Sequence, residues 1–483
     1  MMRNGTQEST HLKVHIAGPA VSLFGPNASG FQRESVTGAV LGRLYYRSKR
    51  GKFLPGILDG FAADANFKAW SLKIRKSLRF QNGRGLVARD LEFTLNNIRN
   101  TRVPTPESSL LKDIKKIVVK SDSEIVVHLG QPNPYFLETL DDPSFGAVPK
   151  EELNTPGSDL IGASPMSGSH LSWKKYPVGA GPYKITKAES DRVFLEKLGV
   201  VPTQAPNTIE IATGPYERAD LALGFDENPD EKNLKGVSLC RPWGILGIYF
   251  NYDSKLARNE RFRQAVSMAV DRKELSKTAR GLKVTSSILP SNLNKKANAN
   301  LRSDQAQAKA FFKEVLAESD RELSIPIDRK HASSGIAPWM KKLEDQFKRC
   351  GLKVRFVISD DVIHFKMESG APSPFRLITF IPGLPRSSMI FQLFRNGSSW
   401  VPHLDKLDEV YERLIDKIAE TGKEDVRSIS RLSELFLKNA YAVPLFEKPL
   451  GIWINKERIQ TIHEDEQDLS FRFEKVFMKR NQR

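Results

Sequence analysis

Gly179-Ala-Gly181-Pro-Tyr183 is the glycine cluster of this chain that most resembles a phosphate-binding loop. It does not fit the dinucleotide-binding pattern, because Lys184 stands where the third glycine belongs and Pro182 has no N–H group to offer a phosphate. The chain also lacks the G-x-x-x-x-G-K-[ST] pattern of nucleotide-hydrolysing proteins. The cluster therefore predicts a structural turn, and no nucleotide cofactor is expected.

The histidines and cysteines do not indicate metal or catalytic chemistry. The eight histidines are scattered singly, and although His463 precedes three acidic residues, adjacent side chains do not converge on one ion. Cys240 and Cys350 are the only cysteines, and we expect two free, buried thiols, with a disulfide as the alternative. No G-x-S-x-G motif or Ser-His-acid spacing occurs. Neither an enzyme nor a metal site is predicted.

Positive charge is concentrated in one segment. The chain has a net charge of +17, and residues 47–120 contain 17 Lys and Arg against 6 Asp and Glu, which gives +11. Such a segment could bind an anionic surface, such as a polyanion or anionic lipid, through Lys115, Lys116 and Lys120. The alternative is a solvated basic face that keeps the protein in solution. No nucleic-acid-binding signature is visible, so specific nucleic-acid binding is not expected.

The length of 483 residues exceeds what one hydrophobic core supports, so two or three lobes are expected. No apolar run approaches the roughly 18 residues of a membrane-spanning helix. The first ten residues are polar and lack the apolar segment of a secretory signal. Two interpretations remain: an exported protein without its signal, located in the periplasm or otherwise outside the cytoplasm, or a cytoplasmic protein.

The middle of the chain has the most regular pattern. Alternating apolar residues over 246–250 predict a strand. Asn259 then precedes an amphipathic helix. Asp271 and Glu274 have the spacing of a capping box at the start of the next helix, and Gly281 can close its far end.

Strands and helices alternate along much of the remaining chain. A helix that ends at Gly351 and feeds a strand is typical of an α/β unit. A hairpin is expected around 47–53 and a turn at Asn82-Gly83. Strands are predicted at 12–16, 70–75, 114–119, 124–129, 183–186, 193–198, 352–358 and 442–446, and helices at 31–46, 90–100, 306–316, 336–350, 404–419 and 425–440.

Segments 54–61, 70–83 and 86–95 resemble, in the right order, the first motifs of the family 5 extracytoplasmic solute-binding proteins, the oligopeptide-, dipeptide- and nickel-binding group of ABC importers. Pro177-Val-Gly-Ala-Gly-Pro-Tyr183 is close to its Val-Gly-Thr-Gly-Pro-Tyr. Phe250-Asn251, followed by Arg263-Gln-Ala-Val-Ser-Met-Ala-Val-Asp-Arg272, resembles its Phe-Asn and Arg-Gln-Ala-x-x-x-Ala-Ile-Asp-Arg.

The resemblance implies an α/β protein with the two-lobed, type II periplasmic-binding-protein-like fold, a hinge just before Asn251, and a third subdomain inserted in the first lobe. The ligand would bind in a cleft that closes by hinge motion. Motif order assigns lobe I to 1–40, 172–247 and 449–483, a strongly basic insert to 41–171, and lobe II to 248–448.

The segment expected to recognise the ligand departs from the family pattern. Peptide-binding members carry an acidic residue there, which pairs with the peptide ammonium, whereas residues 377–386 contain no acid and end in Arg386. Residues 22–26 likewise lack the Asp of a Leu-Asp-Pro motif. An anionic or apolar ligand fits better, since Arg offers a bidentate fork to a carboxylate, although Arg386 could be an ordinary surface residue. Aromatic residues are further candidates for the cleft wall, with core packing as the alternative: Phe24, Trp243, Phe380 and Trp400.

The resulting hypothesis is a monomeric, non-enzymatic receptor that captures a peptide-like or other small organic ligand without a cofactor and delivers it to an ABC permease. The alternative is a cytoplasmic ligand-sensing protein that uses the same fold.

Overall fold

The structure is a computed structural model. It describes residues 10–16, 30–48, 52–100, 108, 110–153, 176–189, 191–199, 204–213, 218–224, 229–236, 244–279, 282–291, 293, 303–318, 321–328, 336–359, 372–380, 386–395, 408–421, 424–448, 451–463 and 471–479. The chain forms two compact units, the first from 1–241 and 450–483 and the second from 242–449. The three-part division expected from the sequence stays a prediction.

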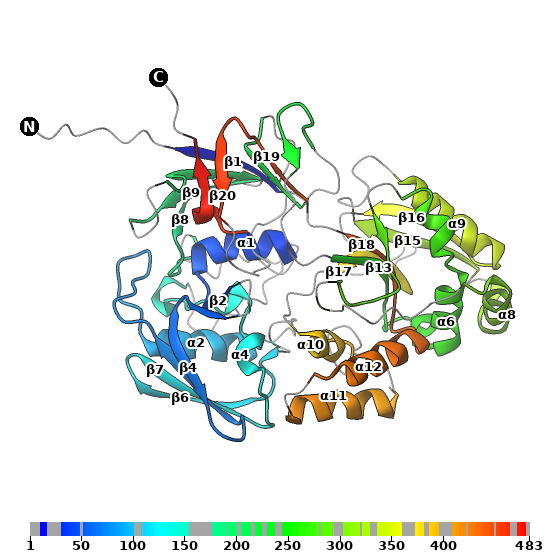
Figure 1. The fold of residues 1–483 in the computed structure, drawn as a ribbon, viewed down its shortest axis with the longest axis horizontal. Coiled ribbons are helices and arrows are strands. Elements are labelled where there is room, and N and C mark those ends of the chain that lie inside the picture. The colour runs from blue at the N-terminus through cyan, green and yellow to red at the C-terminus, as the bar shows by residue number, and fades with distance from the viewer. Residues whose placement is uncertain are drawn as a thin grey trace, which may run out of the picture. The chain divides into compact units, whose positions relative to one another are not determined.

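Unit 1 contains a seven-stranded sheet in the order β12-β19-β11-β1-β10-β9-β8 (Figure 1). The sequence pattern correctly predicts β1, whose alternate residues Leu12, Val14 and Ile16 are fully buried. The strands are β1 (His11–Ile16), β8 (Tyr183–Ala188), β9 (Arg192–Lys197), β10 (Thr208–Ala212), β11 (Leu221–Leu223), β12 (Lys235–Gly236) and β19 (Ile452–Ile454), and a small separate sheet pairs β20 (Ile459–Ile462) with β21 (Val476–Met478).

Helix α1 (Gly30–Leu41) ends earlier than the predicted 31–46. Gly42 has a φ of +79°, the left-handed conformation that terminates helices, and the chain then enters β2 (Tyr45–Arg47), which pairs with β3 (Phe53–Pro55) as the predicted hairpin. The glycine cluster closes this end, since Ala180 and Gly181 donate their N–H groups to Leu41 and Val40. A Cβ atom on Gly179 would lie 2.3 Å from the Leu41 Cα. The cluster is thus a structural turn, as predicted.

A second hydrophobic cluster of unit 1 consists mainly of buried residues of helix α2 and of the four-stranded antiparallel sheet β4-β5-β7-β6, and the helix and the sheet can be followed in Figure 1. The predicted strands at 70–75, 114–119 and 124–129 all belong to this sheet. Its strands are β4 (Leu58–Ala63), β5 (Ala69–Ile74), β6 (Ile114–Ser121) and β7 (Glu124–Leu129), and the accompanying helices are α2 (Ala88–Arg99), α4 (Phe136–Thr139), η1 (Pro143–Phe145) and η2 (Lys150–Glu152); a last 3-10 turn, η7 (Phe473–Lys475), precedes β21.

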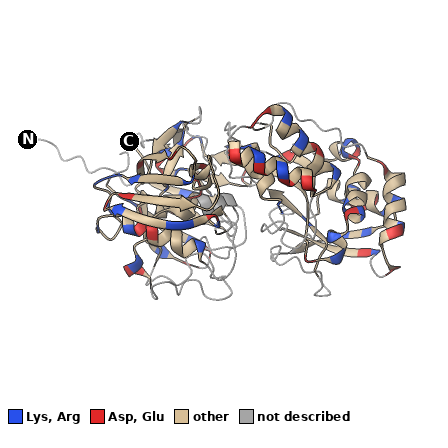
Figure 2. Cartoon of the chain, turned by 90° about the horizontal axis from the view of Figure 1, so that it is seen from below, with Lys and Arg blue, Asp and Glu red and all other residues tan. Residues whose placement is uncertain are grey.

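Folding mixes the charges of the basic segment with acidic ones. Residues 121–153 contain seven Asp and Glu and one Lys, so the net charge of 47–153 is +11 − 6 = +5. Arg84 forms an ion pair with Glu151, and Arg47 lies 2.7 Å from Asp141. Figure 2 shows Asp and Glu interspersed with Lys and Arg along the described elements. Binding of an anionic surface through the exposed Lys115, Lys116 and Lys120 stays a prediction.

Unit 2 contains a six-stranded mixed sheet in the order β14-β18-β13-β17-β15-β16. Its central strand β13 is buried along its whole length, which explains its apolar run. The predicted α/β unit is present, since β15 and β16 pair in parallel and Gly351 closes α9 with a φ of +90°. The strands are β13 (Gly244–Phe250), β14 (Lys283–Val284), β15 (Glu322–Asp328), β16 (Lys353–Ser359), β17 (Phe375–Phe380) and β18 (Ala442–Lys448).

Helices pack on both faces of this sheet. Trp339 of α9 contacts Phe446 on one face, whereas Phe394, beside α10, contacts Tyr249 on the other (Figure 1). Cys350, which follows α9, is a buried free thiol as expected, and Cys240 lies outside the described residues. The helices are α5 (Lys255–Arg258), α6 (Glu260–Ala269), α7 (Arg272–Ser276), α8 (Gln305–Val315), α9 (Pro338–Arg349), α10 (Ser387–Gln392), α11 (Glu409–Thr421) and α12 (Val426–Lys438).

The predicted helix starts in unit 2 are confirmed with one correction. Asn259 caps α6 by accepting from the Phe262 N–H, and Asp271 caps α7 by accepting from the Glu274 N–H at 3.0 Å. Glu274 does not complete the expected box, because Gln346 of α9 accepts the Asp271 N–H. Glu274 binds Gln346 and Arg349 instead, and these contacts, chiefly the Arg349 hydrogen bond, lower the pKa of Glu274 to about 2.

Candidate ligand-binding site

Four cross-strand neighbours form a row across the sheet of unit 2 at the end of β18. The register pairs Lys283 with Glu447, Glu447 with Ile245, and Ile245 with Phe380. Side chains of directly opposed residues lie on the same face of a sheet, so all four share one face. β18 ends at Lys448, the residue before Pro449, where the sequence leaves unit 2.

Glu447 is the centre of a closed hydrogen-bond network. Its side chain is only 5% exposed and accepts from the Ser291 N–H at 2.7 Å, the Ser291 hydroxyl at 2.6 Å and the Lys283 ammonium at 2.8 Å. Burial by itself raises the pKa of this carboxyl, but these donors outweigh burial, so the pKa lies below its ordinary value. The network fixes the segment 283–291 to β18 and leaves Glu447 little capacity to accept a further cation.

The Lys448 side chain lies on the other face of the sheet from the Glu447 side chain, and its electrostatic surroundings differ. Successive strand residues point to opposite faces, so its side chain lies on the α9 side of the sheet. It is buried, and desolvation lowers its pKa from 10.5 to about 7. An ammonium group in such surroundings interacts strongly with any anion that comes beside it, because little water screens the pair. Burial thus shifts Lys448 toward its neutral form near pH 7.

Arg386 begins α10, at the N-cap position, and is half-buried. The next residue, Ser387, donates its hydroxyl to the Leu293 carbonyl at 3.2 Å. Leu293 lies two residues beyond Ser291, which binds Glu447, so one segment connects the start of α10 to the end of β18. The Ser388 N–H and hydroxyl both bind Glu424, which connects α10 to the residue before the α12 cap.

Phe380 packs in the interior of unit 2. Its ring lies 5.9 Å from that of Tyr249 and 5.8 Å from that of Phe394, and it is 5% exposed. Tyr249 is itself buried and donates its hydroxyl to the Ile245 carbonyl. The sequence allows two interpretations of Phe380, a cleft wall and core packing, and this placement agrees with core packing. A role of Phe380 in ligand binding stays a prediction.

Three predicted site residues, Phe24, Trp243 and Trp400, lie outside the described residues, as do 22–26 and 381–385. Glu447 and Lys448 were not singled out from the sequence, although it contained a signal for them. Two charged residues directly continue the apolar run 442–446 and precede a proline. The predicted strand stopped at residue 446, before the two charged residues, whereas β18 includes both of them.

Unit 1 has its own buried charged cluster, in which two arginines share Asp141. Arg43 donates to the Asp141 carbonyl at 2.7 Å, and the Arg47 Nε donates to the Asp141 carboxylate at 2.8 Å. Tyr45, between them in sequence, donates its hydroxyl to the Leu137 carbonyl at 3.1 Å. These contacts join β2 to the segment that follows α4, so the cluster stabilises the fold.

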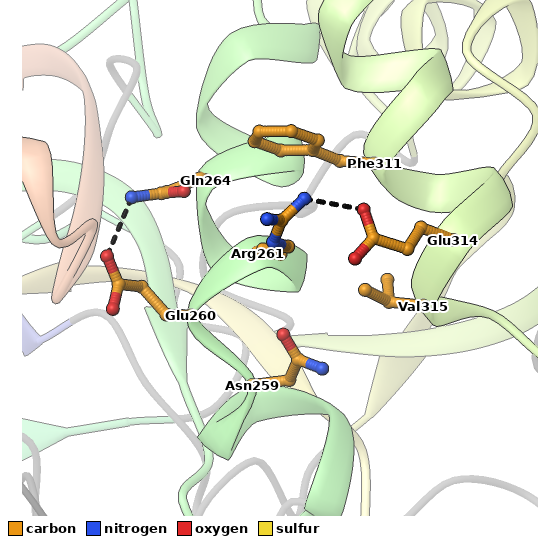
Figure 3. Close-up of a pocket in the computed structure, with 7 residues that line it drawn as sticks. All are labelled: Asn259, Glu260, Arg261, Gln264, Phe311, Glu314 and Val315. Carbon is orange, nitrogen blue, oxygen red and sulfur yellow. Dashed lines mark hydrogen bonds and ion pairs between the residues drawn. The ribbon is translucent and has the colours of Figure 1, made fainter.

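A shallow groove of about 780 Å³ lies between α6 and α8 (Figure 3). Its polar side chains are directed at one another: Arg261 contacts Glu314 at 2.6 Å, and Gln264 donates to Glu260. The Arg261 guanidinium also lies over the Phe311 ring. Because these groups satisfy each other, the groove lacks the convergent polar groups of a ligand site.

Within the described ranges, no set of three or more His, Cys, Asp or Glu side chains is arranged to hold a metal ion. None of the helices in this part of the chain is long and apolar enough to cross a bilayer.

Comparison with known proteins gives a consistent result. The sequence profile of the bacterial extracellular solute-binding proteins, family 5, matches residues 52–197 and 210–373. The dipeptide-binding protein DppE of Bacillus subtilis is 19% identical over 448 residues, which cover 81% of this chain and 78% of that protein. The periplasmic oligopeptide-binding protein OppA of Haemophilus influenzae is 22% identical over 306 residues, 56% of this chain and 54% of that protein.

Solved structures share the fold. The periplasmic binding protein DppA of Helicobacter pylori, in complex with the peptide STSA, superimposes with a TM-score of 0.81 at 14% identity, covering 98% of this chain and 99% of that one. NikZ of Campylobacter jejuni, in complex with Ni(L-His), gives 0.72 at 16% identity, covering 97% and 99%. AgaA from A. tumefaciens R10, in complex with agropinic acid, gives 0.76 at 15% identity, covering 98% and 99%. These likenesses confirm the predicted type II, two-lobed fold.

Proposed function

Because the chain belongs to the bacterial extracellular solute-binding proteins of family 5, we propose that it is the receptor of an ABC importer. Outside the cytoplasm, it captures a peptide-like or other small organic ligand between its lobes. It then delivers this ligand to a permease in the membrane. Members of this family are non-enzymatic transport receptors, which agrees with the absence of a catalytic motif in the sequence. The protein acts as a monomer, and hinge closure retains the ligand.

The ligand of this receptor carries a carboxylate or another anionic group. The observations behind this proposal lie at the end of β18, where Glu447 already accepts from Lys283 and Ser291 and is followed by the basic, buried Lys448. Residues 377–386 contain no acid for a ligand ammonium and end in Arg386, a basic residue at the start of α10. The fold alone does not decide the ligand, since its relatives hold a peptide, agropinic acid and a nickel–histidine complex.

Isothermal titration with paired ligands tests this proposal. N-acetylated peptides with a free carboxylate should bind at least tenfold more tightly than the same peptides with a free amine and an amidated C-terminus. Opines and organic acids extend the series. Lys448→Met and Arg386→Met should each weaken carboxylate binding about tenfold or more, because each loses a poorly solvated charge partner, and tenfold corresponds to about 1.4 kcal/mol.

Lys417→Met and Arg413→Met are matched controls, because both residues are exposed on α11. Both should bind like the unaltered protein. If amidated and acid forms bind equally, the anionic ligand is wrong while the receptor function stands. If no peptide, opine, sugar or acid binds, the receptor function itself is contradicted.

A further inference from the structure

The hairpin formed by β4 and β5 presents two aromatic side chains to solvent. Phe61 on β4 is 40% exposed and Phe67 in the turn is 37% exposed, and the turn residues between Ala63 and Lys68 are exposed as well. At a hairpin tip, polar residues would be better solvated than the exposed part of these rings. These two rings therefore suggest a contact with something other than the rest of this chain.

Phe67 is also held in a conformation that costs energy. Its φ is +54°, in the left-handed region that Gly or Asn adopts with less strain, and a bulky residue there costs on the order of 1–3 kcal/mol. Surrounding bonds enforce it: the Phe67 N–H donates to the Asp64 carbonyl at 3.1 Å, and the Asn133 N–H donates to the Phe67 carbonyl at 3.0 Å. A turn built only for stability would not place phenylalanine here.

The two rings form one rigid patch around a buried tryptophan. The Phe61 ring stacks on Trp70 at 6.2 Å with a 28° angle, and the Phe67 ring lies 6.4 Å from the same indole. Phe53 adds an edge-on contact with Phe61 at 5.0 Å, and Tyr45 stacks on Phe53. The patch is thus preorganised by an aromatic layer that continues into the core, which lowers the entropy cost of binding.

The strand that carries Phe61 also has the geometry of a docking edge. β4 is at the edge of its sheet, and an edge strand offers one side of its backbone to a further strand. Ala62 and Ala63 are exposed and small, and a Cβ atom on Gly60 would have no atom within 4 Å. Exposed carboxylates bracket this short apolar edge, Asp59 before it and Asp64 after it.

We propose that the outer edge of β4, with Phe61 and Phe67, is a docking site for an extended segment of another protein, whose apolar side chains are flanked by basic residues. The segment adds a strand to the sheet, its apolar side chains contact the aromatic patch, and its Lys or Arg side chains pair with Asp59 and Asp64. A second copy of this chain does not fit, because antiparallel β4–β4 pairing centred on Phe61 and Ala62 opposes Asp59 to Asp64 at both ends.

A peptide with both ends blocked, acetyl-Lys-Val-Phe-Val-Phe-Arg-amide, tests the proposal. Titration calorimetry should detect binding, and hydrogen exchange should show slower exchange of the amides at 59–63 when the peptide is present. The analogue with Glu at both charged positions should bind at least tenfold more weakly. Phe61→Ser/Phe67→Gly should abolish binding while preserving the fold, since glycine adopts the φ of residue 67 without strain.

Val426→Ser is the matched control, because Val426 is 63% exposed on α12 of the other unit. It should bind the basic peptide like the unaltered protein. Equal binding of the two peptides, unchanged exchange at 59–63, or full binding by the double variant would each overturn the proposal. So would a dimer in analytical ultracentrifugation that Phe61→Ser dissociates, because that result assigns the edge to a second copy.

Discussion

The two units of this protein both bury charged side chains, but they do so in opposite ways. In unit 1 the Asp141 carboxylate is paired with the Arg47 guanidinium, and Arg43 binds the carbonyl of the same residue. In unit 2 Lys448 is buried with a pKa near 7, one residue from a Glu447 whose acceptors are already occupied. A buried carboxylate paired with a guanidinium ties two segments of unit 1 together, whereas burial of the Lys448 amine disfavours its charged form. The first arrangement supports the fold, and the second makes stability depend on pH.

The largest loss of stability should come from removing the Asp141 carboxylate of unit 1. Asp141→Ala removes the carboxylate that the Arg47 guanidinium binds, and breaking a buried pair typically costs about 3–5 kcal/mol. Thermal unfolding by calorimetry should show a large destabilisation of unit 1. Asp142→Ala is the control, since that residue caps η1 by accepting from the Ser144 N–H, and loss of such a cap costs about 1 kcal/mol. Equal effects of the two substitutions would contradict the structural role of the cluster.

The pH dependence of stability should identify Lys448. Its pKa is about 7 in the folded protein and 10.5 when unfolded, so between these values the unfolded chain binds more protons and the unfolding free energy rises with pH. The rise amounts to about 1.4 kcal/mol for each pH unit in that interval. Lys448→Met should remove this rise and be more stable than the unaltered protein at pH 6–7, measured by urea unfolding. A decrease in stability at pH 6 would contradict the lowered pKa of Lys448.

Glu447→Gln should lower the unfolding free energy at pH 7, whereas Lys448→Met should raise it at pH 6–7. The change for Glu447→Gln should be the smaller of the two. The folded pKa of Glu447 is lowered, so its contribution is present above the unfolded value and is lost as pH falls through the folded pKa. We expect about 1–3 kcal/mol of destabilisation at pH 7, the usual contribution of hydrogen bonds to a charged group, and little difference from the unaltered protein near pH 3. A difference that persists at pH 3 would show that the effect is not electrostatic.

The smallest effect should come from Lys283→Met. The Lys283 side chain is 70% exposed, so its ion pair with Glu447 is screened by solvent and contributes about 0–1 kcal/mol. Ser291→Ala should cost more than Lys283→Met, because the Ser291 hydroxyl donates to Glu447 at 2.6 Å and its short side chain loses less conformational entropy than that of Lys283. Urea unfolding measures the loss of unfolding free energy in both variants. A larger loss for Lys283→Met than for Ser291→Ala would show that the ion pair stabilises Glu447 most, which would weaken the contrast with unit 1.

Much of the secondary structure could be predicted from local pattern. The strand at 12–16, the caps at Asn259 and Asp271, and the glycine turn at 179–181 depend on neighbouring residues, so the sequence revealed them. One error depends on a distant residue, and the other on a local glycine that the helix prediction did not use. Gln346 takes the N–H expected to bind Glu274, and α1 stops at Leu41 because Gly42 turns the chain into a hairpin.

The candidate site was less accessible to prediction. Arg386 was selected because it replaces an expected acid, and the structure gives it a half-buried position at the start of α10. Phe380 was selected as an aromatic candidate and packs in the interior of unit 2. Glu447 and Lys448 were missed, because only the sheet register shows that one binds Lys283 and that the other lies desolvated on the opposite face.

The sequence by itself determined the family, the order of the elements and the absence of a recognisable catalytic motif, since these depend on motifs and periodicity along the chain. Only the tertiary structure decided which charges are satisfied, because ion pairing and desolvation depend on residues far apart in sequence, such as Lys283 and Glu447. The same reason explains the basic segment at 47–120, whose excess charge is reduced by carboxylates that the fold brings beside it.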